Sequence, residues 1–220
     1  WLITSTKNRG YHILTIEDPI EFVHESKKCL INQLEVGRDT QSFSQALRSA
    51  LREDPDVVVV GEMRDLETIR LAMTAAETGH LVFATLHTTS AALTINRIID
   101  VFPAEEKDMI RSMLSDSLQA VVTQTLLKKV GGGRIAAHEI MIGIPAVRNL
   151  IREDKVAQIY SVIQTSSSLE MKTLDQSLST LVDEGLITLE VAREKAVSPK
   201  HISKEERNNY SLPYFPEFPK

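Results

Sequence analysis

The sequence contains little of what several common protein classes require. A single cysteine, Cys29, among 220 residues excludes a disulfide within the chain and is typical of a reducing compartment. No run approaches the roughly 18 consecutive apolar residues of a spanning helix, so we expect no transmembrane segment. Aromatic residues make up only 5% and the net charge is −5, which disfavours a channel for single-stranded nucleic acid.

What the chain does contain is a succession of patterns typical of an α/β fold. Strands are predicted at residues 12–16, 57–60 and 81–86, and the second consists of four valines, as expected for a strand buried on both faces. Apolar residues at three- and four-residue spacing predict a helix over 43–51, with Ser42 or Thr40 as its cap, and another from Leu66 that ends at Gly79. This alternation predicts a mostly parallel sheet flanked by helices.

A change of pattern after the glycines at 131–133 predicts a second part of the chain. Residues 135–142 are predicted to form a strand after a glycine hairpin, and four short helices are predicted over 146–153, 155–164, 173–184 and 188–196. We therefore expect an α/β core over 1–143 and a small C-terminal helical lobe over 144–198. Residues 199–220, with four prolines, are expected to be a poorly ordered tail.

Acidic residues follow the predicted strands at the end where parallel sheets bind ligands. Glu17, Asp18 and Glu21 follow the first strand, and three carboxylates so close together need a cation, a helix N-terminus or arginines beside them. A solvated acidic loop is the alternative. Glu62 follows the valine strand after one glycine, an arrangement that resembles a Walker B strand. The same segment is equally consistent with a buried strand that is followed by an acidic loop residue.

Histidines and arginines are the remaining candidates for a phosphate site. His80 and His87 flank the third strand, and opposite ends of one strand are too far apart to bind a single zinc ion. Each is either structural or, beside acidic residues and a phosphate, able to stabilise transferred charge. In a ring ATPase, one or two arginines can reach the nucleotide of a neighbouring subunit. The sequence does not show which of its arginines would do so, and the candidates are Arg64, Arg70, Arg97, Arg111, Arg134, Arg148 and Arg152.

Four ordered segments together resemble the type II/type IV secretion ATPases. ILTIEDPIEF at 13–22 resembles their Asp box, ALREDPDVVVVGEMRDLET at 50–68 their Walker B region, and GHLVFATLHT at 79–88 their His box. AVRNLIRED at 146–154 is similar to a helix that marks the pilus-retraction (PilT) subgroup, in which isoleucine usually stands where this chain has Val147. The likeness covers about residues 11–198.

The resemblance implies a RecA-like P-loop NTPase core that hydrolyses ATP with Mg²⁺ to drive pilus retraction and twitching motility. It implies a homohexamer on the cytoplasmic side of the inner membrane, bound to an inner-membrane platform protein and in some systems to a paralogous retraction ATPase, with no nucleic-acid partner. Glu62 and Glu21 would be catalytic, and Mg²⁺ would be reached through water near Glu62, with no direct protein ligand. The positions near phosphate would be Glu17, Asp18, His80 and His87. The retraction-coupling segment would comprise Ala146, Val147, Arg148, Asn149, Leu150, Ile151, Arg152 and Glu153.

The chain departs from the family pattern in one important respect. No Gly-Lys-Ser or Gly-Lys-Thr occurs, so the phosphate-binding loop of the GxxxxGK[ST] type is not within these 220 residues. Residues 1–6 resemble the end of the helix that follows this loop, and we expect a truncated catalytic domain that is inactive alone. The alternatives are a non-catalytic or accessory member of the motor ring and a RecA-like nucleic-acid motor.

Overall fold

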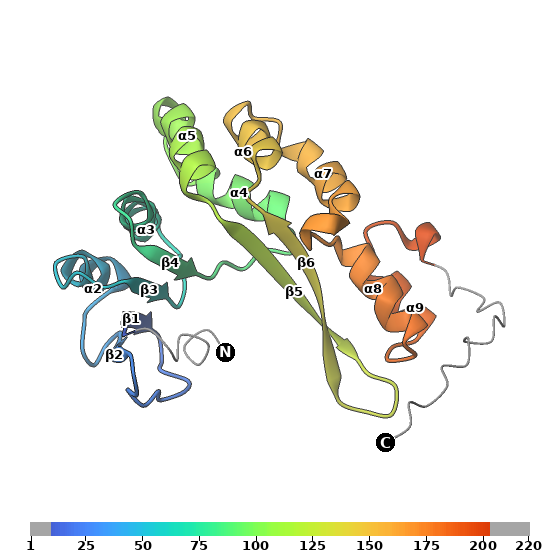
Figure 1. Cartoon of the computed structure of the whole chain (residues 1–220), viewed down its shortest axis with the longest axis horizontal. Coiled ribbons are helices and arrows are strands. Elements are labelled where there is room, and N and C mark those ends of the chain that lie inside the picture. Colours follow the sequence, from blue (N-terminus) through green and yellow to red (C-terminus); the bar gives the residue numbers. More distant parts are fainter. Residues whose placement is uncertain (1–9, 203–220) are drawn as a thin grey trace, which may run out of the picture. The chain divides into compact units, whose positions relative to one another are not determined.

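The computed structural model describes residues 10–202, and its first part is a parallel sheet of four strands (Figure 1). The strands are β1 (His12–Glu17), β2 (Leu30–Glu35), β3 (Val57–Val60) and β4 (Leu81–Ala84), and they lie in the order β2-β1-β3-β4. Every neighbouring pair is parallel, with Ile13 opposite Val57 and Val57 opposite Leu81. The predicted parallel sheet is therefore confirmed, and its two central strands carry the buried side chains.

Three helices accompany this sheet, and each begins at a polar cap. The helices are α2 (Phe43–Ala50), α3 (Leu66–Glu77) and α4 (Ala91–Asp100). Their caps Ser42, Asp65 and Ser90 each accept a hydrogen bond from a backbone N–H in the first turn, which satisfies a donor that the helix leaves unpaired. The helix α3 ends as predicted before Gly79, which has a φ of 102°.

Two features of the sheet differ from the sequence prediction. Strand β2 was not predicted, because LINQLE has little apolar character and its residues are mostly half-buried at the sheet edge. Strand β4 ends at Ala84 and not at residue 86. The next residue, Thr85, is bonded to the segment that follows β3: its hydroxyl donates to the carbonyl of Gly61, and its carbonyl accepts from the N–H of Met63.

The same compact unit contains a second layer of short helices. These are η1 (Ala104–Glu106), α5 (Lys107–Ser117), α6 (Pro145–Arg152), η2 (Val156–Gln158) and α7 (Ile159–Thr165). Ile110 of α5, Val147 and Ile151 of α6 and Ile159 of α7 are at most 1% exposed, and they share one core cluster with Ile95 of α4. Because α6 and α7 bury their apolar faces in this cluster, they belong with the α/β unit.

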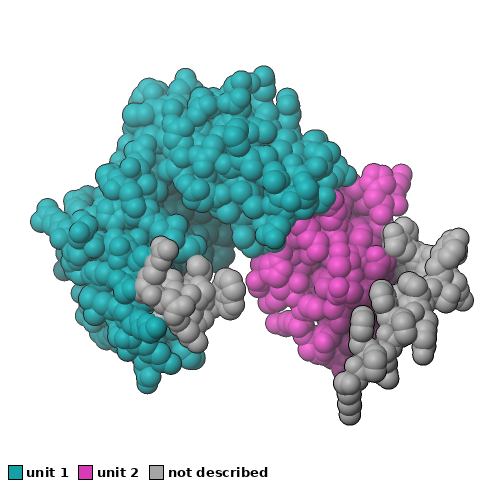
Figure 2. Space-filling model, viewed as in Figure 1, with its two compact units in different colours: residues 1–123, 140–171 teal, residues 124–139, 172–220 magenta. Residues whose placement is uncertain are grey.

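The division into units therefore differs from the predicted boundary near residue 143 (Figure 2). One unit comprises the described residues up to Thr123 together with Ile140–Met171, and the other comprises Gln124–Glu139 with the described residues from Lys172 onward. Strands β5 (Ala120–Lys128) and β6 (Arg134–Ile142) pair with each other and run through both units. The predicted glycine turn joins them, and all three of its glycines have positive φ.

The second unit has its own small core. The far half of the β5–β6 pair contributes Leu127 and Ala137, which pack with residues of α8 (Leu174–Asp183), α9 (Leu189–Lys195) and the loop between them. The short helix η3 (Ser167–Leu169) precedes this unit and η4 (Pro199–His201) follows α9. Ile202, at 1% exposure, accepts hydrogen bonds from Arg193, so the expected poorly ordered tail is wrong for residues 199–202. Residues 203–220 lie outside the described part.

Candidate functional site

Glu62 is the acidic residue that follows β3, and two basic side chains hold its carboxylate. Its side chain is 18% exposed, far less than its two partners. One carboxylate oxygen lies 2.6 Å from the guanidinium of Arg64, and the other lies 3.1 Å from Nε2 of His87, which follows β4. The hydrogen bond from Arg64 is the largest cause that lowers the pKa of Glu62, partial burial opposes it, and His87 lowers the pKa further.

The backbone around Glu62 is held by the neighbouring strand ends. Gly61 donates its N–H to the carbonyl of Ile16 at 2.7 Å, and Met63 donates to the carbonyl of Thr85 at 3.0 Å. A Cβ on Gly61 would lie 2.9 Å from the Ile16 carbonyl oxygen and 3.3 Å from the Cα of Glu17. Glycine is therefore required here by the close approach of β1, and this approach places Glu62 beside the acidic loop that follows β1.

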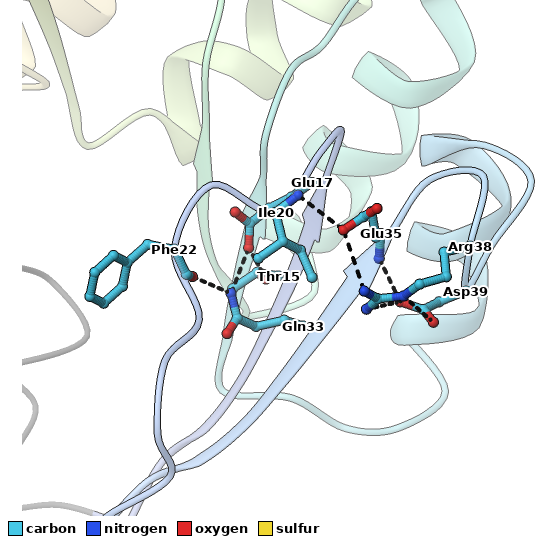
Figure 3. A network of polar contacts seen from close by, with 8 residues as sticks. All are labelled: Thr15, Glu17, Ile20, Phe22, Gln33, Glu35, Arg38 and Asp39. Atoms are coloured by element: carbon cyan, nitrogen blue, oxygen red, sulfur yellow. Dashed lines mark hydrogen bonds and ion pairs between the residues drawn. The ribbon is translucent and has the colours of Figure 1, made fainter.

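The acidic loop after β1 is held by one side chain of β2 (Figure 3). The amide nitrogen of Gln33 donates to the carboxylate of Glu17 and to the carbonyl of Phe22, both at 3.0 Å, while its oxygen accepts from the N–H of His24 at 2.7 Å. Thr15 donates its hydroxyl to the same Glu17 oxygen at 2.6 Å. Glu17 is thus a partly buried acceptor that orders the loop, and its carboxylate is already engaged.

A second anchor of the loop is Glu35 at the end of β2. Its carboxylate accepts from the N–H of Ile20 at 3.3 Å and lies 3.5 Å from Arg38, while its own N–H donates to Asp39 (Figure 3). The loop between these anchors includes the cis peptide bond before Pro19. Two strand-end side chains of β2 therefore hold the segment that contains Asp18 and Glu21.

The sequence-predicted carboxylates of this loop differ in their surroundings. Asp18 is exposed, and its charge contributes, after the larger effect of Glu62, to raising the pKa of Arg64. Glu21 is also exposed, and within residues 10–202 it has no hydrogen bond or ion pair. The structure thus brings Arg64 and His87 together on the carboxylate of Glu62, whereas the roles of Asp18 and Glu21 stay predictions.

His80 lies before the amino end of β4, whereas His87 lies beyond its carboxyl end. The backbone N–H of His80 donates to the carbonyl of Ala75 at 3.1 Å, and its Nδ1 lies 3.0 Å from the same oxygen and 3.1 Å from the hydroxyl of Thr78. These contacts close the turn after α3. The structure does not bring His80 to Glu62, and its proximity to phosphate stays a prediction.

The segment Ala146–Glu153 forms α6 and the residue after it, and it is bound to α5. Arg148 donates to the carbonyls of Gly143 at 2.6 Å and Ser115 at 2.8 Å, and also to the carbonyl of Asp116. Arg152 pairs with the carboxylate of Asp116 at 2.8 Å. Beyond the helix, Arg111 of α5, whose side chain is only 14% exposed, pairs with Asp154 at 2.9 Å.

The residues of this segment divide into two groups. Val147 and Ile151 are fully buried, Arg148 and Leu150 are partly buried, and the side chains of Ala146, Asn149, Arg152 and Glu153 are exposed. The buried group fixes the helix to its unit, and the exposed group forms a surface of that unit.

Sequence reasoning missed two polar residues of the site. Gln33 lies on the strand that was not predicted, so nothing in the sequence indicated that its side chain holds the acidic loop. Arg64 was considered only as one arginine among seven, although its position two residues after Glu62 and the requirement for a cation near the acidic loop both pointed to it.

Comparison with known proteins identifies the family to which these residues belong. The model of the family "Type II/IV secretion system protein" matches residues 2–132, which include the whole four-stranded sheet and its carboxyl edge. The chain belongs to this family. The α/β core predicted from the four ordered motifs is therefore confirmed as that of a secretion-type ATPase.

Three similar members of the secretion family place the chain more closely. It is 76% identical over 191 residues to the "Type IV pilus retractation ATPase PilT" of Pseudomonas aeruginosa, covering 87% of the chain and 56% of that protein. It is 66% identical over 193 residues to a "Twitching motility protein" of Neisseria gonorrhoeae, covering 87% and 52%. A crystal structure of the pilus retraction motor PilT with bound ADP superimposes with a TM-score of 0.84 at 53% identity, covering 90% of the chain and 56% of that one.

The chain spans about half the length of these secretion-family relatives. In the described residues, no helix is long and apolar enough to cross a bilayer.

Proposed function

We propose that the protein containing this chain is an ATP-hydrolysing motor that powers type IV pilus retraction and twitching motility. The observation that carries this proposal is the position of the Glu62 carboxylate, which lies at the carboxyl ends of the parallel strands between Arg64 and His87. A carboxylate in this place can orient and deprotonate the water that attacks the γ-phosphate. The printed names of the Pseudomonas and Neisseria relatives support retraction as the work that hydrolysis drives.

The remaining roles follow from position. His87 lies on the open side of Glu62, with a side chain 86% exposed, and would stabilise charge on the transferred phosphoryl group. Glu21 would assist water activation, and His80 would act near phosphate only through a rearrangement or a neighbouring subunit. The segment Ala146–Glu153, which lies on α6 and the residue after it, would couple hydrolysis to movement, as its similarity to the retraction subgroup implies.

The carboxylates at the carboxyl ends of the strands suit a Mg²⁺ ion that enters together with the nucleotide. Among residues 10–202 no group of three or more His, Cys, Asp or Glu side chains could hold a metal ion by itself. Mg²⁺ commonly keeps several waters and binds one or two carboxylates together with substrate phosphates. Asp18 and Glu62 are carboxylates suited to such water-mediated contacts, and the ion would supply neutralisation of phosphate charge when bound.

The assembly is also part of the proposal. We propose a homohexamer at the cytoplasmic face of the inner membrane that acts on a platform protein, in some systems with a paralogous retraction ATPase. The phosphate-binding loop is not within these 220 residues, so we expect the chain by itself to bind ATP weakly.

Steady-state ATPase activity of the complete gene product, beside that of the 220-residue chain, tests the proposal. We expect activity in the complete product and a loss of about 10²- to 10⁴-fold in kcat on Glu62→Gln, with nucleotide binding retained. Glu53→Gln is the matched control, because Glu53 is an exposed carboxylate before β3, at the other edge of the sheet.

Near-normal turnover of the Glu62→Gln variant would remove Glu62 from the catalytic role. A complete gene product that forms rings but hydrolyses no ATP would instead indicate an accessory member of the motor ring. Salt-dependent binding to single-stranded DNA would indicate a nucleic-acid motor.

A further inference from the structure

Arg64 has the contacts of a residue that organises the proposed catalytic carboxylate. Its guanidinium lies 2.6 Å from the Oε2 atom of Glu62, and the charge of Asp18 contributes less than Glu62 to raising the pKa of Arg64. These two acids come from different strand ends, β3 and the loop after β1. Arg64 is therefore the cation paired directly with Glu62, and the acidic loop after β1 lies within its electrostatic reach.

His87 does not replace Arg64 in this role. It approaches the other oxygen of Glu62 at 3.1 Å, but its side chain is 86% exposed, and an imidazole carries charge only when it is protonated. A guanidinium is always charged and presents several N–H donors in a fixed planar geometry. Between the two donors, Arg64 supplies the permanent charge and the shorter contact.

The geometry leaves Glu62 able to accept a further hydrogen bond. An ionised carboxylate has about four lone-pair sites on its two oxygens. Arg64 occupies one site on Oε2 and His87 one on Oε1, so the carboxylate cannot rotate freely, and each oxygen retains a site for a water molecule. The hydrogen bond from Arg64 also lowers the pKa of Glu62, which favours the ionised form that accepts hydrogen bonds from water.

We propose that Arg64 is a positioning residue for ATP hydrolysis, which fixes the orientation of the Glu62 carboxylate through their direct ion pair. This inference rests on the proposed function, since it concerns how Glu62 activates water. Because Arg64 acts through Glu62, its removal should slow the chemical step and leave the binding of the substrate unchanged.

The main test is the kinetics of Arg64 variants in the complete gene product. We expect Arg64→Gln to lower kcat about 10- to 100-fold with little change in KM, because the carboxylate loses its fixed orientation. The acid limb of the kcat–pH profile should move to higher pH, since Glu62 no longer has the partner that lowers its pKa. Arg64→Lys should restore part of kcat, because it restores the charge without the planar geometry.

Two further variants separate positioning from general damage. Arg48→Gln is the matched control: Arg48 is 62% exposed, as Arg64 is 63% exposed, and pairs with Glu67 of α3. It should leave both kcat and the pH profile unchanged. In a Glu62→Gln background, Arg64→Gln should lower kcat by less than about twofold, because residues that act through one another are not additive. An equal loss in both backgrounds, or an unmoved acid limb in Arg64→Gln, would overturn the proposal.

A second measurement does not depend on ATP hydrolysis. The carboxyl carbon of Glu62 can be titrated by NMR in the 220-residue chain and in its Arg64→Gln variant. We expect a pKa below the ordinary glutamate range in the first and a higher pKa in the second. Equal titration in both chains would refute the positioning role even if the complete product were an active ATPase. A clear difference in a protein without ATPase activity would show that Arg64 holds Glu62 while the proposed function itself fails.

Discussion

Gly61 is the position where adding a single methyl group tests the packing of the site. Its N–H bonds to the Ile16 carbonyl at 2.7 Å, and the Cβ of an alanine would lie 2.9 Å from that same oxygen. Real Cβ atoms essentially never approach so closely, and the atom in the way is backbone, which cannot turn aside as a side chain can. Gly61→Ala must therefore push the Glu62 loop away from β1.

The expected cost follows from two opposing terms. Overpacking of a well-packed site costs about 1–3 kcal/mol. Replacing glycine by alanine restricts the unfolded chain and returns about 0.4–1 kcal/mol. We therefore expect the free energy of unfolding to fall by roughly 1–2 kcal/mol. In a chain of this size, each kcal/mol corresponds to about 2–4 °C in Tm.

Thermal unfolding followed by circular dichroism measures this difference, and amide exchange of β1 and β3 shows whether the loss lies in the sheet. Gly10→Ala is the matched control, because the nearest atom to its Cβ would be the Lys28 carbonyl oxygen at an ordinary 3.6 Å. It should be neutral or stabilising by about 0.4–1 kcal/mol. If Gly61→Ala were as stable as Gly10→Ala, the close packing of the Glu62 loop on β1 would be refuted.

The remaining predictions concern α6. Ile151→Ala should lower the free energy of unfolding by about 2–5 kcal/mol in chemical denaturation, because Ile151 is fully buried in the core cluster, whereas Asn149→Ala on the exposed side should change it by no more than about 0.5 kcal/mol. Replacement of Leu150, which is partly buried, should leave ATP hydrolysis by the complete gene product largely intact and abolish twitching; an equal loss of hydrolysis would show that Leu150 supports the core and does not couple it to movement.

Local patterns in the sequence predicted those elements whose physical cause is itself local. The valine run gave β3, the spacing of apolar residues with Ser42 as cap gave α2, and Gly79 marked the end of α3. The positions of Glu62 and His87 directly after strands also placed them at one edge of a parallel sheet. The same reasoning placed His80 and His87 at opposite ends of one strand, as the structure has them, although the resemblance assigned both to phosphate.

Only the tertiary structure decided which of these segments meet. Strand β2 is half-buried at the sheet edge, so its residues lack an apolar pattern, and the clamp formed by Gln33 depends on its pairing with β1. Arg64 became distinguishable from other arginines once the structure showed its ion pair with Glu62, whose other carboxylate oxygen contacts His87 from the end of the neighbouring strand. The assignment of α6 and α7 to the α/β unit likewise depended on which core buries their apolar faces. Helical periodicity shows that a face is apolar, but the partner that covers it is set by contacts between residues far apart in the chain.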